Sequence, residues 1–301
     1  MSESSPGPAG RPVRPGHRTA RHLYDQARRT TRKPTTRGAP VPSTVPAPAV
    51  APLARIVQGS GPGLLLAHGA GGSARDNWGP LLADLAAHRT VVAPDYPGSG
   101  DSPYEPGEPT LDEYADRLVA AADEEGLDTF DLAGFSLGAA VAVRIANRHP
   151  GRVRSLLLIA GVAGGSARQS TLTELMVGLR DRPAELADLM LTVVLGHSWV
   201  DALPADQLAA LREGLRSPLP AGFPQQFRLA ARTDVRAELA SIAVPTLVVG
   251  AAEDMLVQPS QHRLLAEGIP GARFVELPSG HLPMVEALPQ LREVVMEFVK
   301  G

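Results

Sequence analysis

The chain of 301 residues contains no cysteine. This absence excludes disulfide bonds, thiolate metal ligands and a cysteine nucleophile. Aromatic residues make up only 4% of the sequence, so a core must be built mainly from Leu, Val, Ala and Ile. No apolar run approaches the roughly 18 residues that a transmembrane helix needs, and the N-terminus lacks the apolar segment of a secretory signal. We therefore expect a cytoplasmic protein with no membrane partner.

Charge is unevenly distributed along the chain. The formal net charge is only −3, which gives no general attraction to nucleic acid. Residues 1–50 nevertheless hold nine Lys or Arg, two Asp or Glu, and nine prolines. This composition predicts a disordered basic tail over 1–50, and the alternative interpretation is a docking arm for an acidic partner. Richness in Ala, Gly, Arg and Pro with only two lysines is typical of a high-GC bacterial genome.

Short apolar runs alternate with amphipathic segments over residues 51–301. Such runs are typical of strands that are buried on both faces of a sheet. The expected strands are 53–57, 63–67, 90–94, 129–133, 153–160, 245–250 and 272–277. The alternation predicts an α/β fold, with a mostly parallel, doubly wound sheet and helices on both faces. In such a sheet the functional site lies beyond the carboxyl ends of the strands.

Residues 162–240 interrupt this alternation. They contain no convincing strand, and their periodicity predicts four helices, at 171–180, 184–195, 207–216 and 224–232. We interpret the segment as a helical cap inserted over the site; an ordinary helical layer is the alternative. Its large apolar residues are candidates for an acyl pocket, although the same spacing is also typical of plain core. These candidates are Met176, Leu179, Leu189, Met190, Val193, Val194 and Trp199.

The segment Gly134-Phe135-Ser136-Leu137-Gly138 stands between an expected strand and an expected helix. A serine between two glycines on such a turn has the geometry of a nucleophile elbow. The turn is too tight for flanking Cβ atoms, and the N-terminus of the helix favours developing negative charge. Ser136 is therefore the candidate nucleophile.

A serine nucleophile needs a base, and the base needs an orienting acid. Of eight histidines, only His281 lies in a loop directly after the last expected strand, at the carboxyl edge of the sheet. Asp254 lies in the loop after the preceding strand and is the candidate acid. The neighbouring carboxylate of Glu253 is its competitor. The chain order is thus Ser136, Asp254 and His281.

In this order and spacing the chain resembles the α/β-hydrolase family, over about residues 52–300. The motifs that carry the resemblance are His68-Gly69, Asp95-Tyr96-Pro97-Gly98-Ser99-Gly100-Asp101-Ser102, Gly134-Phe135-Ser136-Leu137-Gly138, Asp254-Met255-Leu256-Val257 and Gly280-His281. The resemblance implies an oxyanion hole made by the backbone N–H groups of Leu137 and Ala70, with Gly71 as the second choice for the latter. It also implies structural roles for His68 and Asp95.

The expected reaction is hydrolysis of a carboxylic ester, lactone or thioester of a small acyl molecule through an acyl-enzyme. This chemistry requires no cofactor and no metal. The Ser136 nucleophile disfavours the dehalogenases and epoxide hydrolases of the fold, which use Asp. Hydrolysis of carbon–carbon bonds and cofactor-free perhydrolysis by the same triad remain alternatives. A non-hydrolytic binding or isomerising protein is a further alternative, disfavoured because such members commonly lose a triad residue.

Overall fold

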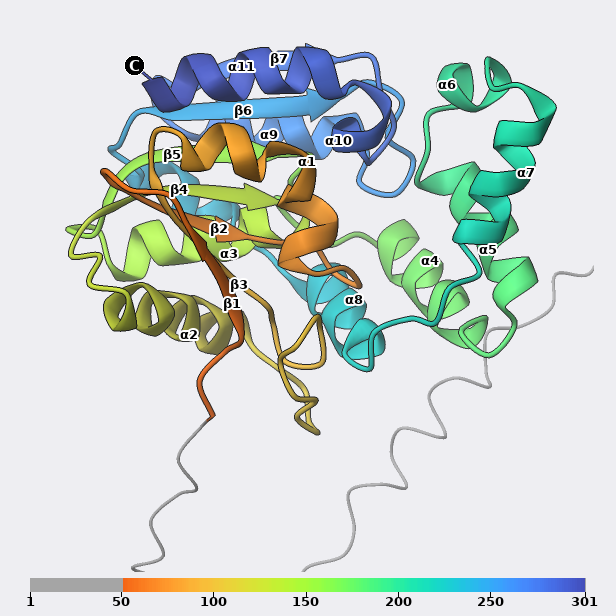
Figure 1. Ribbon diagram of the computed structural model, residues 1–301, viewed down its shortest axis with the longest axis horizontal. Coiled ribbons are helices and arrows are strands. Elements are labelled where there is room, and N and C mark those ends of the chain that lie inside the picture. The colour runs from red at the N-terminus through yellow and green to blue at the C-terminus, as the bar shows by residue number, and fades with distance from the viewer. Residues whose placement is uncertain (1–50, 301) are drawn as a thin grey trace, which may run out of the picture. The chain divides into compact units, whose positions relative to one another are not determined.

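The computed structural model describes residues 51–300, so the tail predicted for residues 1–50 lies outside the described residues (Figure 1). Seven strands form one sheet in the order β1-β3-β2-β4-β5-β6-β7. Only β1 is antiparallel to its neighbour, and the remaining pairs are parallel. The strands are β1 (Arg55–Gln58), β2 (Gly63–Ala67), β3 (Thr90–Pro94), β4 (Phe130–Phe135), β5 (Val153–Ile159), β6 (Thr246–Ala251) and β7 (Arg273–Leu277). The predicted mostly parallel sheet is confirmed.

Helices cover both faces of the sheet, as expected for a doubly wound fold. Helices α1 (Ala74–Ala86) and α11 (Leu288–Lys300) pack on one face through one apolar cluster. Helices α2 (Leu111–Glu124), α3 (Leu137–Arg148) and α9 (Pro259–Gly268) pack on the other through a second. The residues of β2 alternate between the two clusters, because successive side chains of a strand point to opposite faces.

Apolar spacing in the sequence predicts a helix over 78–87, but helix α1 begins four residues earlier, at Ala74. The side chain of Ser73 accepts a hydrogen bond from the backbone N–H of Asp76 over 3.1 Å, which caps the helix. The first turn of α1 places Asn77 beside the loop after β2, where its side-chain oxygen accepts the backbone N–H of Gly69 over 2.8 Å. The interpretation from apolar spacing missed this turn because the cap is polar.

A helical insertion joins β5 to β6, and Figure 1 shows α4 to α7 beyond the arrowheads of β4 and β6. Its α-helices are α4 (Ala167–Gly178), α5 (Pro183–Val193), α6 (His197–Asp201), α7 (Ala205–Gly214) and α8 (Phe223–Arg232). An apolar cluster that includes Met176, Phe223 and Phe227 holds the cap together. The 3₁₀ helix η2 (Arg236–Ser241) then packs against α3 and α9 and returns the chain to the sheet.

A short helix, α10 (Pro283–Glu286), follows β7 and had no counterpart in the sequence prediction. Within residues 51–300, no helix is both long and apolar enough to cross a membrane.

Candidate active site

The turn from β4 to α3 carries Ser136 in a left-handed backbone conformation, with φ 55° and ψ −116°. A non-glycine residue rarely adopts this conformation, and here it lifts the side chain above the end of the sheet. A Cβ atom on Gly134 would lie 2.2 Å from the carbonyl oxygen of Gly138, and one on Gly138 would lie 2.2 Å from the carbonyl oxygen of Ala67. Both flanking positions therefore require glycine.

Ser136, His281 and Asp254 form one hydrogen-bonded chain. The hydroxyl oxygen of Ser136 lies 2.9 Å from Nε2 of His281, and Nδ1 of His281 lies 2.6 Å from Oδ2 of Asp254. All three side chains are buried at the carboxyl ends of the parallel strands. The structure thus brings together the three residues that the sequence singled out.

The second oxygen of Asp254 accepts the backbone N–H groups of Leu256, over 2.9 Å, and Val257, over 2.8 Å. Burial by itself raises the pKa of the Asp254 carboxyl, but interactions with His281 and His262 outweigh burial and hold the pKa below its usual range. Asp254 is therefore an ionised acceptor for His281.

Glu253, the competing carboxylate, binds the cap instead of His281. Its Oε2 accepts the backbone N–H of Ser198 over 2.9 Å and lies 3.0 Å from Nδ1 of His197, both on the cap helix α6. Only Asp254 of the two neighbours reaches the imidazole.

A second buried histidine lies behind Asp254. Nδ1 of His262 accepts the backbone N–H of Ala251 over 3.2 Å, so the proton of its neutral ring is on Nε2. That Nε2 lies 3.5 Å from Oδ2 of Asp254. The sequence places His262 within a helix but does not predict that it lies near Asp254, because that proximity depends on the packing of α9 against β6.

Two backbone N–H groups are the sequence candidates for an oxyanion hole, those of Leu137 and Ala70. Leu137 is the first residue of α3, and Ala70 lies in the loop after β2. Among the hydrogen bonds between residues 51–300, neither N–H is a donor. The N–H of Gly71, the second choice in the sequence interpretation, instead donates to Oε1 of Gln226 over 2.9 Å.

Gln226 is a fully buried residue of α8 that the sequence interpretation missed. Besides accepting from Gly71, its amide nitrogen donates to the hydroxyl of Ser99 over 2.9 Å and to the carbonyl of Pro97 over 3.2 Å. It thus joins the cap to two loops at the edge of the sheet. A sequence signal exists, since Gln226 falls between Phe223 and Phe227 on the apolar face of α8.

The chain matches the alpha/beta hydrolase family over residues 64–294. It belongs to that family. A pyrrolizixenacetamide deacetylase of Xenorhabdus hominickii is 36% identical over 233 residues, covering 76% of this chain and 88% of that enzyme. A 2-hydroxymuconate semialdehyde hydrolase of a Pseudomonas species is 30% identical over 255 residues, or 81% of this chain and 85% of the relative. A solved thermophilic esterase from Thermogutta terrifontis superposes with a TM-score of 0.72 at 26% identity, covering 82% of this chain and 93% of that one.

In this hydrolase, His68 and Asp95 hold loops, and among the hydrogen bonds of residues 51–300 neither is bonded to Ser136, Asp254 or His281. Nδ1–H of His68 donates to the carbonyl of Gly69 over 2.7 Å, and Nε2 accepts the backbone N–H of Tyr96 over 2.9 Å. Burial lowers the pKa of His68 to about 4, so the ring is neutral. Asp95 accepts the backbone N–H of Ala74 over 2.7 Å.

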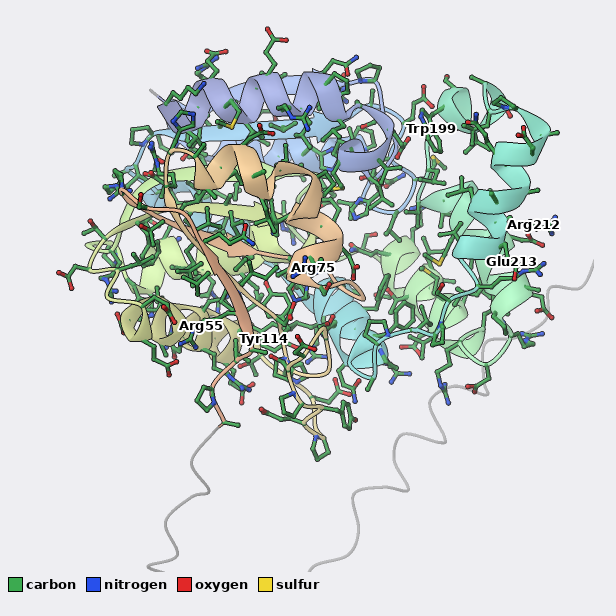
Figure 2. The ribbon with its side chains drawn as sticks, viewed as in Figure 1. Arg55, Arg75, Tyr114, Trp199, Arg212 and Glu213 are labelled. Atoms are coloured by element: carbon green, nitrogen blue, oxygen red, sulfur yellow. The ribbon has the colours of Figure 1, made fainter. Side chains whose placement is uncertain are left out.

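The hydrolase has a cavity of about 510 Å³ that opens onto Ser136 and His281. Three of the seven candidate pocket residues line it, namely Met176, Met190 and Val194. The other four, Leu179, Leu189, Val193 and Trp199, are not among its lining residues. Figure 2 labels Trp199 on α6. Helical spacing could not distinguish lining residues from those that pack between cap helices.

The described part of the hydrolase, residues 51–300, holds no cluster of three or more His, Cys, Asp or Glu side chains placed to bind a metal ion.

Proposed function

We propose that this α/β-hydrolase is a serine hydrolase that cleaves a small acyl substrate through an acyl-enzyme. The observation that carries the proposal is the continuous chain of contacts from Ser136 to His281, at 2.9 Å, and from His281 to Asp254, at 2.6 Å. Such a chain activates a hydroxyl that is otherwise a poor nucleophile at neutral pH.

In the first step, Oγ of Ser136 attacks the substrate carbonyl while Nε2 of His281 takes its proton. Asp254 holds the His281 proton on Nδ1 and stabilises the imidazolium. The N–H groups of Leu137 and Ala70 donate to the oxyanion, and one such donor typically lowers the barrier by about 3 kcal/mol. Collapse of the intermediate expels the leaving group, which takes the proton from His281.

In the second step, His281 removes a proton from water, and the resulting hydroxide attacks the acyl-enzyme carbonyl. The new tetrahedral intermediate uses the same two N–H donors. Its collapse breaks the bond to Oγ, which regains the proton from His281. The products are a carboxylic acid and regenerated Ser136.

A carboxylic ester, lactone or thioester fits this site best. The cavity beside Ser136 is lined mainly by apolar side chains, which suits an acyl chain of modest size. The similarity to an esterase of the same fold supports this class. An acetamide is a second candidate substrate, since the deacetylase of Xenorhabdus hominickii is 36% identical to this chain.

The decisive test compares wild type with Ser136→Ala on p-nitrophenyl acetate and with a fluorophosphonate probe. We expect Ser136→Ala to lose both turnover and labelling. Ser170→Ala, which removes an exposed serine of α4, is the matched control and should keep both. Undiminished turnover by Ser136→Ala would overturn the assignment of the nucleophile.

A further inference from the structure

Helix α4 buries two polar side chains on the face that it turns inward. Gln169 is 9% exposed and Thr173 is 3% exposed, and they are one helical turn apart. Met176 and Val177 are the other buried residues of this helix. Two of the four buried positions are therefore polar, which is unusual for the buried face of an amphipathic helix.

Neither side chain has a hydrogen-bond partner among residues 51–300. The amide group of Gln169 is unbonded, although the backbone N–H of that residue donates to the Ser166 side chain. Exposed threonines of the cap donate to the carbonyl four residues earlier, as Thr171 does to Ala167 over 2.9 Å. The Thr173 hydroxyl makes no such bond. Polar groups at buried positions are almost always hydrogen-bonded, so a pair without a protein partner is expected to bond to water or to a ligand.

Both side chains line the cavity that contains Ser136 and His281. Their polar atoms are not sealed inside the protein, unlike the indole nitrogen of Trp78, and they are reached from the cavity. The rest of the cap wall is largely apolar, with Met176 and Phe227 next to the pair along α4 and α8. None of the lining residues is Lys or Arg, and one, Asp76, is acidic.

We propose that Gln169 and Thr173 bind an uncharged polar group of the substrate, such as an amide, away from the scissile carbonyl. The Gln169 amide and the Thr173 hydroxyl each supply a donor and an acceptor, which matches the N–H and C=O of an amide. The absence of a cation among the lining residues, together with Asp76, makes the cavity unfavourable for a substrate carboxylate. This inference rests on the proposed function and specifies the substrate class of the same site.

The test uses three p-nitrophenyl esters of similar chain length. The 4-acetamidobutanoate carries an amide, the heptanoate replaces it with methylenes, and the adipate monoester carries a carboxylate. We expect wild type to favour the amide ester over the heptanoate in kcat/KM by about ten-fold, the discrimination that one or two neutral hydrogen bonds supply. The adipate monoester should be the poorest of the three.

Gln169→Met and Thr173→Val remove the hydrogen-bonding groups and keep the volume. Each should lower the ratio of kcat/KM for the amide ester to that for the heptanoate by about three- to ten-fold. Thr171→Val makes the same chemical change on the exposed side of α4 and should leave the ratio unchanged. Thermal unfolding of each variant shows that it is folded.

The experiments distinguish failure of this inference from failure of the proposed function. If Ser136 is labelled by the fluorophosphonate but the ratio is the same in wild type, Gln169→Met and Thr173→Val, then the pair only holds water and the inference is overturned. If Ser136→Ala hydrolyses all three esters as fast as wild type, the proposed function is overturned and the inference with it.

Discussion

The backbone N–H of His281 donates to the carbonyl oxygen of Val194 over 2.6 Å. Val194 is the C-cap residue directly after the cap helix α5, so the loop that carries the candidate base is hydrogen-bonded directly to the cap. The cap therefore does more than enclose the cavity, because it also supports the position of the imidazole. Two further contacts between the cap and the loops around the candidate site lead to testable predictions.

The first contact is centred on Glu286 in α10. Its carboxylate accepts the backbone N–H of Gly280 over 2.7 Å, that of Gly196 over 2.8 Å and that of Leu282 over 3.2 Å. Burial raises the pKa of this carboxyl, although the three N–H donors oppose the change. One side chain thus holds Gly280 and Leu282, the two neighbours of His281, and also Gly196, which precedes α6 in the cap.

Glu286→Gln keeps the size of the side chain but replaces one acceptor oxygen with an NH₂ group. At least one buried N–H loses its partner, so we expect the free energy of unfolding to fall by about 2 kcal/mol. We also expect kcat for p-nitrophenyl acetate to fall about ten-fold, because the imidazole is held less well. Glu293→Gln, on the exposed side of α11, is the control for urea unfolding and kinetics. Equal stability of the two variants would contradict this role.

The second contact is the Gln226 side chain, which accepts the N–H of Gly71, whereas the N–H of Ala70 donates to no other residue within 51–300. Gln226→Met fills the same space but leaves the N–H of Gly71 unpaired and able to turn toward the site. We expect kcat to fall by about ten-fold with little change in KM, since an oxyanion donor acts mainly in the transition state.

Gln207→Met makes the same change on the exposed surface of α7 and should match wild type. Steady-state kinetics on p-nitrophenyl acetate checks both variants. A rise in KM with unchanged kcat in Gln226→Met would show that the residue serves substrate binding and not the oxyanion loop.

The sheet, and the proximity of Ser136, Asp254 and His281, were predictable because local signals determine them. Each buried strand is a short apolar run, and the glycines on either side of Ser136 are required by backbone contacts within one turn. Chain order then brings the loops after β6 and β7 to the same edge of a parallel sheet.

The supporting residues were not predictable in this way. Gln226 and Glu286 act through contacts to loops that are 155 and 90 residues away along the chain. The pocket lining depends on how the cap helices turn about their axes, and periodicity alone does not reveal that orientation. Helix α10 has only four residues, which is too short for a periodic pattern.

His262 is expected to act through Asp254. Its Nε2–H lies 3.5 Å from Oδ2 and helps to hold the pKa of the Asp254 carboxyl below its usual range. His262→Phe removes this proton, so the pKa of Asp254 rises and the carboxylate is protonated at higher pH. We expect the acidic limb of the kcat/KM profile to move to higher pH and kcat to fall several-fold.

His262→Gln supplies an NH₂ group near the place of Nε2–H and should restore part of the profile. His88→Phe, at an exposed position after α1, is the matched control. If the acidic limb of His262→Phe coincides with that of wild type, the second histidine has only a packing role.

His68 makes stability depend on pH. Burial lowers its pKa to about 4, against about 6.5 in an unfolded chain. Between these values the unfolded state binds one more proton than the folded state, so the free energy of unfolding rises with pH. The stabilisation is complete above about pH 6.5 and is lost as the pH falls toward 4, by about 3 kcal/mol in total.

His68→Gln cannot take up this proton, yet its side-chain oxygen can still accept the N–H of Tyr96. Urea unfolding of wild type and His68→Gln at several pH values between 4 and 7 therefore gives curves that converge as the pH falls. Wild type is the more stable protein at pH 7, and most of its advantage is gone near pH 4. His88→Gln, an exposed control, should run parallel to wild type. Parallel curves for His68→Gln would mean that the buried ring does not govern the acid sensitivity of the fold.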